Sequence, residues 1–202
     1  MSKYRYDIQQ NSEEWFAIKV AKFSASIADS LLMDKTAVGY KNLIDKIVEE
    51  TITGQQMEGR WGGNASTERG HEFEPIAAAD FELNTFIDTE IIGVVEYDEW
   101  TLCSPDRLIG NDGLLQIKCP LFKTQREYLR KQKVPGNYYK QMQFELFCTD
   151  RKYNIFYSFH PKLPAVQIKL ERDEAMIAEI IKRLEEAKQE VLIEVEYLNS
   201  LK

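Results

Sequence analysis

Cysteine, histidine and long apolar runs are all scarce in this 202-residue sequence. Its three cysteines, Cys103, Cys119 and Cys148, are scattered and odd in number, which fits a reducing compartment better than a disulfide framework. Two histidines without close Cys/His spacing give no zinc signature. No apolar run approaches the roughly 20 residues that a membrane span needs, and the N-terminus MSKYRYDIQQ lacks the apolar core of a signal peptide. These absences predict a cytoplasmic protein.

Acidic residues outnumber basic ones, and the formal net charge is −7. Taken alone, this average argues mildly against nucleic acid as a partner. The segment PLFKTQREYLRKQK at 120–133 differs, because it carries five cations and only one acid. Such a run is either a nucleic-acid contact or a solvated helix face. The length and the hydrophobic content of 44% predict one globular domain spanning residues 1–202.

The hydrophobic pattern predicts helices that surround a central mixed β-sheet, in an α/β or α+β domain. The expected helices are 13–32 (a short helix, a turn, and a second helix capped by Ser24), 39–53, 71–85 with Pro75 in its first turn, 136–149, and a long amphipathic helix from 173. The expected strands are 91–98, 102–109, 113–118, 153–159 and 165–170. The glycine-rich segment 57–70 is expected to be a loop.

A tight hairpin is predicted at Gly110-Asn111-Asp112-Gly113, because these residue types tolerate the positive φ of short turns. Residues two apart share a face of a strand, so Gln116 and Lys118 point one way, and Leu115 and Ile117 point the other way, to the core. Folding the hairpin brings Asp106 beside both of these side chains. An acid, an amide and a lysine therefore gather on one surface.

Oxygen donors on a rigid sheet suit Mg²⁺ or Mn²⁺. A neighbouring lysine orients an attacking water or neutralises charge that develops at phosphorus. This is the chemistry of metal-assisted phosphodiester hydrolysis. For the short pattern alone, an ordinary polar surface hairpin remains the alternative.

Four blocks in order along the chain resemble the phage lambda exonuclease and YqaJ-like viral recombinase family, in the PD-(D/E)xK nuclease superfamily. They are EWFAIKVAKFSASIADSL, RGHEFEPIAAADFE, CSPDRLIGNDGLLQIKCP and YYKQMQFELFCT, and they span about residues 13 to 149. The resemblance implies a restriction-endonuclease-like core. It also implies roles for five residues around the metal: Asp106 as the central carboxylate, Gln116 as the second ligand, Ile117 through its backbone carbonyl, Glu74 as a further acid, and Lys118 as the catalytic lysine.

The same resemblance implies a magnesium-dependent 5′→3′ exonuclease that acts on double-stranded DNA ends and leaves 3′ overhangs. Lys19, Ser26, Ser104 and Gln141 match the positions of a 5′-phosphate pocket, with lysine where the family usually has arginine. A homotrimeric ring around DNA is implied, together with a phage single-strand annealing protein as partner in the bacterial cytoplasm. The candidates for contacts inside the ring are Lys35, Arg60 and the 123–133 run, and the candidates for a strand-separating wedge are Trp61 and Met57, although Trp61 equally fits a loop-packing role.

Gln116 departs from the family motif, which has glutamate at this position. A glutamine oxygen can ligate Mg²⁺ but carries no charge, so weaker metal binding and lower activity are expected, and Gln116→Glu is expected to raise the rate by about tenfold or more. Glutamine is either natural here or introduced as a substrate trap. Two other functions stay open: an endonuclease of the same superfamily, and a catalytically weakened module that binds DNA ends.

Overall fold

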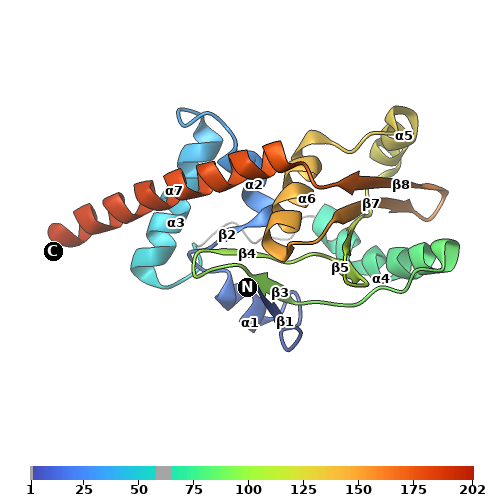
Figure 1. Ribbon diagram of the computed structural model, residues 1–202, viewed down its shortest axis with the longest axis horizontal. Helices are drawn as coiled ribbons and strands as arrows, with labels where there is room; N and C mark the ends of the chain where they lie inside the picture. Colours follow the sequence, from blue (N-terminus) through green and yellow to red (C-terminus); the bar gives the residue numbers. More distant parts are fainter. Residues whose placement is uncertain (1, 58–64) are drawn as a thin grey trace.

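The computed structural model describes the backbone of residues 2–57 and 65–202 (Figure 1). Its helices are α1 (Glu13–Ile18), α2 (Ala28–Leu31), α3 (Val38–Thr53), α4 (Ala65–Thr85), α5 (Phe122–Lys131), α6 (Gly136–Thr149) and α7 (Glu174–Ser200), with a 3₁₀ turn at Ala25–Ile27. Its strands are β1 (Lys3–Arg5), β2 (Phe23–Ser24), β3 (Val94–Glu96), β4 (Thr101–Cys103), β5 (Arg107–Ile109), β6 (Gly113–Lys118), β7 (Tyr153–His160) and β8 (Leu163–Glu171). Within the described residues, no helix has the length and apolarity that a membrane crossing requires.

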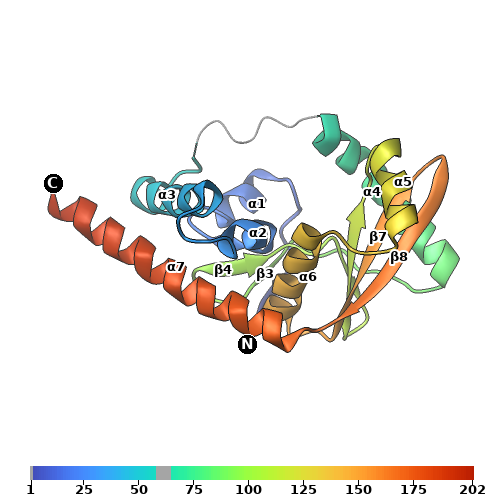
Figure 2. The same ribbon diagram turned by 90° about the horizontal axis from the view of Figure 1, so that it is seen from above.

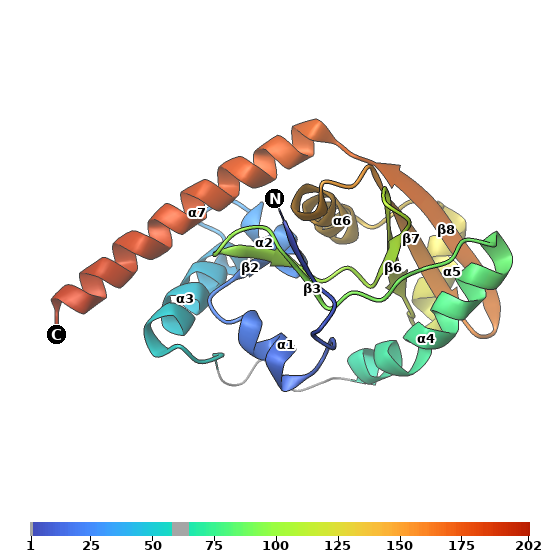
Figure 3. The ribbon, with the colours of Figure 1, turned by 60° about the horizontal axis from the view of Figure 1, so that its bottom comes forward.

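The predicted mixed sheet flanked by helices is confirmed, and its strands divide into two sheets of four. The first sheet has the order β1-β3-β4-β2, with β2 and β4 parallel, and the second has the order β5-β6-β7-β8, with β6 and β7 parallel. Helix α6 packs against strands of both sheets (Figure 3). Helices α2, α3 and α7 lie on one side of α6, while α4 and α5 lie on the other, beside the second sheet (Figure 2).

The chain passes between the two sheets at Ser104-Pro105-Asp106. The sequence predicted one strand over 102–109, but β4 ends at Cys103 and β5 begins at Arg107. Proline has no N–H to donate to a strand partner, so a strand interior is unfavourable for Pro105. This break places Asp106 at the junction of the sheets, directly before the hairpin.

The predicted hairpin forms between β5 and β6, with Leu108 opposite Leu114 and Ile109 opposite Gly113. Gly110 takes a positive φ of 48° in the turn. The buried guanidinium of Arg151 holds the turn from behind, because its Nη1 lies 2.8 Å from the carbonyl oxygen of Gly110 and 2.7 Å from that of Gly113. A turn that is tied to the rest of the molecule keeps the following strand β6 in register.

Two apolar clusters hold these layers together. Alternate residues of β6, Leu115 and Ile117, pack with Ala77 and Phe81 of α4, as the hairpin prediction required of core-facing positions. The larger cluster joins α2, α3, α6 and α7 to the first sheet, and the predicted stripe of α7 supplies Ile177, Ile180, Leu184, Ala187 and Val191 to it. Helix α4 is therefore positioned by one face of β6, and Gln116 and Lys118 lie on the opposite face.

Three local predictions were wrong. The second helix expected within 13–32 is reduced to a 3₁₀ turn and the single-turn α2, and the Ser24 side chain does not cap it but lies 3.0 Å from the Ser26 hydroxyl. Pro75 lies inside α4 and not in its first turn, because the helix already begins at Ala65. A proline removes one helical hydrogen bond without forbidding the turns before it. The loop expected at 57–70 is thus helical from 65, and 58–64 lie outside the described residues.

Candidate active site

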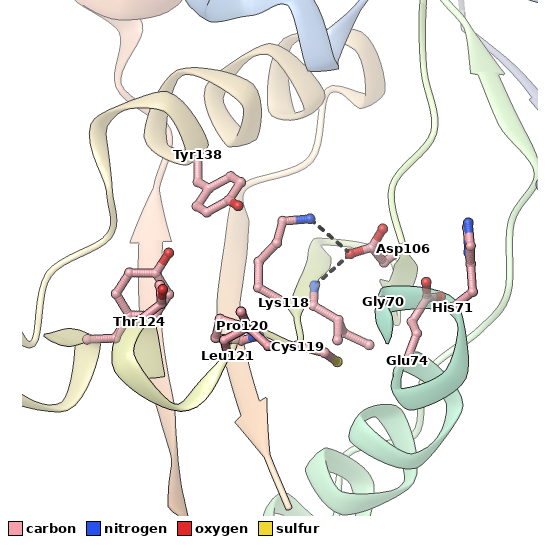
Figure 4. Close-up of a pocket in the computed structure, with 12 residues that line it drawn as sticks. Gly70, His71, Glu74, Asp106, Lys118, Cys119, Pro120, Leu121, Thr124 and Tyr138 are labelled. Atoms are coloured by element: carbon pink, nitrogen blue, oxygen red, sulfur yellow. Dashed lines mark hydrogen bonds and ion pairs between the residues drawn. The ribbon is translucent and has the colours of Figure 1, made fainter. Parts of the chain in front are cut away.

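The hairpin brings Asp106, Gln116 and Lys118 together, as the strand register predicts. One oxygen of Asp106, Oδ2, accepts hydrogen bonds from the backbone N–H of Ile117 at 2.6 Å and from Nε2 of Gln116 at 2.7 Å. The Lys118 ammonium lies 3.9 Å from the same oxygen. Figure 4 shows Lys118 and Asp106 pointing toward each other across the pocket.

Glu74 enters the same pocket from α4, on the side of Asp106 that faces away from Lys118 (Figure 4). Its carboxylate lies 3.4 Å from Nη1 of Arg107. Burial, and then the negative charge of Asp106, raise the pKa of Glu74 to about 7. Two carboxylates that repel each other in a pocket of about 560 Å³ form a place where a cation would be stabilised.

A chain of amides leads from Gln116 into the protein interior. Nε2 of Gln141 lies 3.2 Å from Oε1 of Gln116 and 2.9 Å from Oε1 of Glu145. The other oxygen of Glu145 accepts a hydrogen bond from Nδ2 of Asn154 at 2.9 Å. Burial, and then the charge of Asp106, raise the pKa of Glu145 to about 8. A third acidic side chain of the region thus lies behind the motif glutamine.

A second, smaller pocket of about 190 Å³ adjoins the first, and His71, Glu74 and Asp106 line both. All four positions predicted to hold a 5′-phosphate line it: Lys19, Ser26, Ser104 and Gln141. The Ser104 hydroxyl accepts a hydrogen bond from the Trp15 indole at 3.1 Å, which leaves its own hydrogen to donate. The four residues that the family resemblance singled out thus come from separate segments of the chain and lie around one pocket.

Lys19 follows α1 and lies over the Trp15 ring, with its ammonium 3.5 Å from the ring centroid. Burial, and to a smaller extent the charge of Lys46, lower the pKa of Lys19 to about 7. A cation held in this way lacks an acidic partner among the described residues and would gain one from a bound phosphate.

Not every predicted contact fits equally well. Both hydrogens of the Gln141 amide are already donated, to Gln116 and to Glu145, so a phosphate would have to replace one of these acceptors. Lys35 lies elsewhere, 2.5 Å from Glu190 and 3.0 Å from Glu186 of α7. Its predicted role in DNA binding stays a prediction. Arg60 and Trp61 lie outside the described residues, and Met57 precedes them with its N–H bound to Glu50.

The donor set suits a hard divalent cation. Asp106, Glu74 and Ile117 line one pocket. Gln116 lies beside Asp106, with its amide nitrogen donating to that carboxylate and its oxygen accepting from Gln141. In the described part of the chain no three His, Cys, Asp or Glu side chains converge closely enough to form a metal cluster by themselves. The ion would therefore rely on amide, carbonyl and water oxygens as well as on the two acids.

Two residues of the site escaped the sequence prediction. His71 lines both pockets and lies one helical turn before Glu74, so their spacing of three residues on α4 was an available signal. Glu145 offered a weaker signal, because it follows Gln141 by four residues in the buried second half of α6. A single acid among apolar neighbours gives no indication of the partner it meets across the fold.

A mixed sheet flanked by helices, with Asp106, Gln116 and Lys118 converging at a hairpin, defines a restriction-endonuclease-like core of the PD-(D/E)xK type. The family model of the YqaJ-like viral recombinase domain matches residues 14–152. The chain belongs to this family.

Solved structures agree with this assignment. The alkaline exonuclease LHK-Exo from Laribacter hongkongensis is 32% identical to the chain, with a TM-score of 0.86 over 94% of this chain and 97% of that one. The same protein in complex with dAMP gives a TM-score of 0.87 at the same identity and coverage. A phage-related exonuclease from Haemophilus somnus 129PT, at 13% identity and a TM-score of 0.68 over 90% and 96% of the two chains, shares the fold. No curated protein matches the chain.

Proposed function

We propose that this protein is a divalent-metal-dependent 5′→3′ exonuclease, which acts on double-stranded DNA ends and leaves 3′ single-stranded overhangs. The proposal rests on one observation: two adjoining pockets share Glu74 and Asp106 as lining residues. One pocket has the hairpin carboxylate and Lys118, and the other has Lys19, Ser26 and Ser104. A phosphate anchor beside a hydrolytic centre restricts cleavage to the end of a strand.

The residues take distinct roles in this proposal. Asp106 and Glu74 would hold Mg²⁺ or Mn²⁺ with the Ile117 carbonyl, and the ion would supply Lewis-acid activation of the phosphodiester and of water. Lys118, held near Asp106, would orient the attacking water or stabilise the charge that forms at phosphorus. Lys19, Ser26 and Ser104 would bind the 5′-phosphate through a cation and two hydroxyls.

A basic helix next to the larger pocket supports DNA as the substrate. Thr124 and Tyr128 of α5 line that pocket. The predicted basic run around them is exposed: Lys123, Arg126, Arg130, Lys131 and Lys133. Among the described residues, only Lys131 of these five forms an ion pair, at 3.9 Å from Glu127. Unpaired cations at the mouth of a nuclease pocket suit a phosphate backbone.

The solved relatives support the same activity. LHK-Exo is an alkaline exonuclease, and one of its structures holds dAMP, a nucleoside monophosphate of the kind that exonuclease digestion releases. We extend this activity to the present chain because the identity of 32% covers nearly all of both proteins.

The assembly and partner follow from the family. We infer a homotrimeric ring with DNA in its channel, which works with a phage single-strand annealing protein that coats the exposed strand. The net charge of −7 is compatible with this arrangement, since only the channel needs to be basic.

One observation favours a second candidate function. The Gln116 amide donates to Asp106 and so presents its nitrogen, not its oxygen, to the central carboxylate. A site in this state resembles a weakened module that binds DNA ends more than it resembles an efficient hydrolase.

Digestion of 5′-phosphorylated linear duplex tests the proposal. We expect nucleotide release with Mg²⁺, none with a chelator, and no attack on the same DNA as a closed circle. Asp106→Asn keeps an acceptor for the Ile117 N–H, so it should fold normally and lose activity by roughly 10²-fold or more. Tight binding to ends without hydrolysis would favour the second candidate, and cutting of closed circles would favour an endonuclease.

A further inference from the structure

Glu145 on α6 is a buried acid without a cationic partner among the described residues. Its side chain is 1% exposed, and both of its oxygens accept hydrogen bonds from amides, those of Gln141 and Asn154. A carboxylate removed from water without a balancing cation is costly, and a neutral residue of the same shape would usually stabilise the fold. Its presence therefore calls for a role in the site that it adjoins.

The place of Glu145 relative to Gln116 indicates that role. The two side chains are joined through one residue, because the Gln141 amide donates to both of them. Glu145, Gln141 and Asp106 also line the same pocket. The acid on α6 thus lies directly behind the amide that occupies the acidic position of the hairpin motif.

We propose that Glu145 supplies the negative charge that Gln116 lacks, so that the second acid of the site comes from α6 instead of β6 and glutamine is the native residue at 116. The charge count agrees. An Asp–Glu hairpin beside Glu74 presents three carboxylates, and Asp106 with Glu145 beside Glu74 also presents three once a bound cation favours the ionised forms of the two glutamates, whose pKa values burial raises in the metal-free protein. This inference rests on the proposed metal-dependent function.

Glu145 acts through Gln141 as a positioning residue. Its oxygen fixes the Gln141 amide, which in turn fixes the oxygen of Gln116, and its charge, once it is ionised, adds to that of Asp106. The expectation from the sequence, that Gln116→Glu raises the rate about tenfold, assumes that no other residue replaces the charge missing at position 116. With Glu145 in place, the expected gain is smaller than that.

A charge-swap series tests the proposal. Calorimetry measures the Mn²⁺ affinity of each variant, and thermal unfolding checks that each variant is folded. Glu145→Gln should weaken Mn²⁺ binding by about tenfold or more in the native background, but by less than about threefold when combined with Gln116→Glu. The swap variant, with both changes, should bind Mn²⁺ within about threefold of the native protein. If Glu145→Gln alone does not fold, the swap compared with Gln116→Glu decides the same question.

Glu50→Gln is the matched control. Glu50 is also 1% exposed and also accepts two N–H donors, those of Ala21 and Met57, but it lines neither pocket. It should leave Mn²⁺ affinity unchanged. Equal Mn²⁺ binding by the native protein and Glu145→Gln, while Asp106→Asn loses it, would overturn the inference alone. Native protein that binds no Mn²⁺ would overturn it together with the proposed function.

Discussion

Asp106 derives its chemistry from where the backbone leaves one sheet and enters the next. Asp106 lies between the two sheets, directly after Pro105, and its carboxylate accepts hydrogen bonds from Ile117 and Gln116 of the hairpin. The acid is thereby oriented before any ligand arrives. The expected loss of activity in Asp106→Asn measures this role.

Lys19 leads to a prediction about protons. With a pKa of about 7 in the free protein, its ammonium is mostly deprotonated at pH 8. A 5′-phosphate, whose second pKa is about 6, is then a dianion that favours the charged lysine. Binding of a 5′-phosphorylated duplex at pH 8 without metal should therefore take up a proton, and affinity should fall as pH rises above about 7.

Calorimetry in two buffers of different ionisation enthalpy counts this proton. A duplex with a 5′-hydroxyl end should show no uptake, and Lys19→Gln should abolish the uptake for the phosphorylated end. Equal proton counts for both ends in the native protein would refute the assigned phosphate contact.

The relative positions of single residues can be predicted from the sequence where two geometric constraints apply to them at once. Asp106, Gln116 and Lys118 were predictable, because the alternation along a strand and the register of a short hairpin leave one arrangement. Glu145 was not, since its role depends on the distance between a helix and a strand that are separated by about 30 residues of chain.

At the scale of elements, the β5–β6 hairpin depends on Arg151. Its guanidinium donates to two carbonyls at the turn, those of Gly110 and Gly113. We predict that Arg151→Met lowers the free energy of unfolding by at least about 2 kcal/mol, because each buried acceptor left without a donor costs about 1–3 kcal/mol. Urea denaturation measures the change.

Lys152→Met is the matched control for this prediction. Lys152 forms an exposed ion pair with Asp112 at 2.9 Å in the same turn. An exposed pair contributes about 0–1 kcal/mol. If Arg151→Met destabilised the protein no more than Lys152→Met does, the turn would not depend on the buried guanidinium.

Helix α5 is predicted to contact the DNA backbone. Lys123 is exposed at the start of α5, beside the residues that line the larger pocket. Lys123→Gln should weaken duplex binding in Ca²⁺ and make the slope of log affinity against log salt less negative by about 0.9. Lys182→Gln, an exposed lysine on α7, is the control and should change neither quantity. Identical slopes for both variants would leave α5 as a solvated helix face.

The sequence predicted some elements to the residue and misplaced others. Strand 113–118 and helix 136–149 have the predicted bounds, because turn residues or a proline mark their ends. Helix α4 was misplaced, since Pro75 looked like a first-turn residue although the helix continues before it. Local signals mark where a helix is permitted to begin, and tertiary packing decides where it does begin.

At the scale of the whole molecule, charge is distributed unevenly around one site. The exposed cations of α5 border the larger pocket, while α7 carries acids on its outer face and extends beyond the body of the protein (Figure 1). This separation explains how an acidic protein can bind DNA at one place and repel it elsewhere. The net charge of the sequence does not reveal this separation, because it is a sum over the whole chain.

The order of label release from a linear duplex tests the central claim most directly. One blunt duplex carries a 5′-label and a second, of the same sequence, carries a 3′-label, and both are digested with Mg²⁺. The account predicts that the 5′-label leaves first in a small product, while the 3′-labelled strand persists as a lengthening single-stranded overhang. Early release of the 3′-label, or internal fragments from both duplexes, would contradict it.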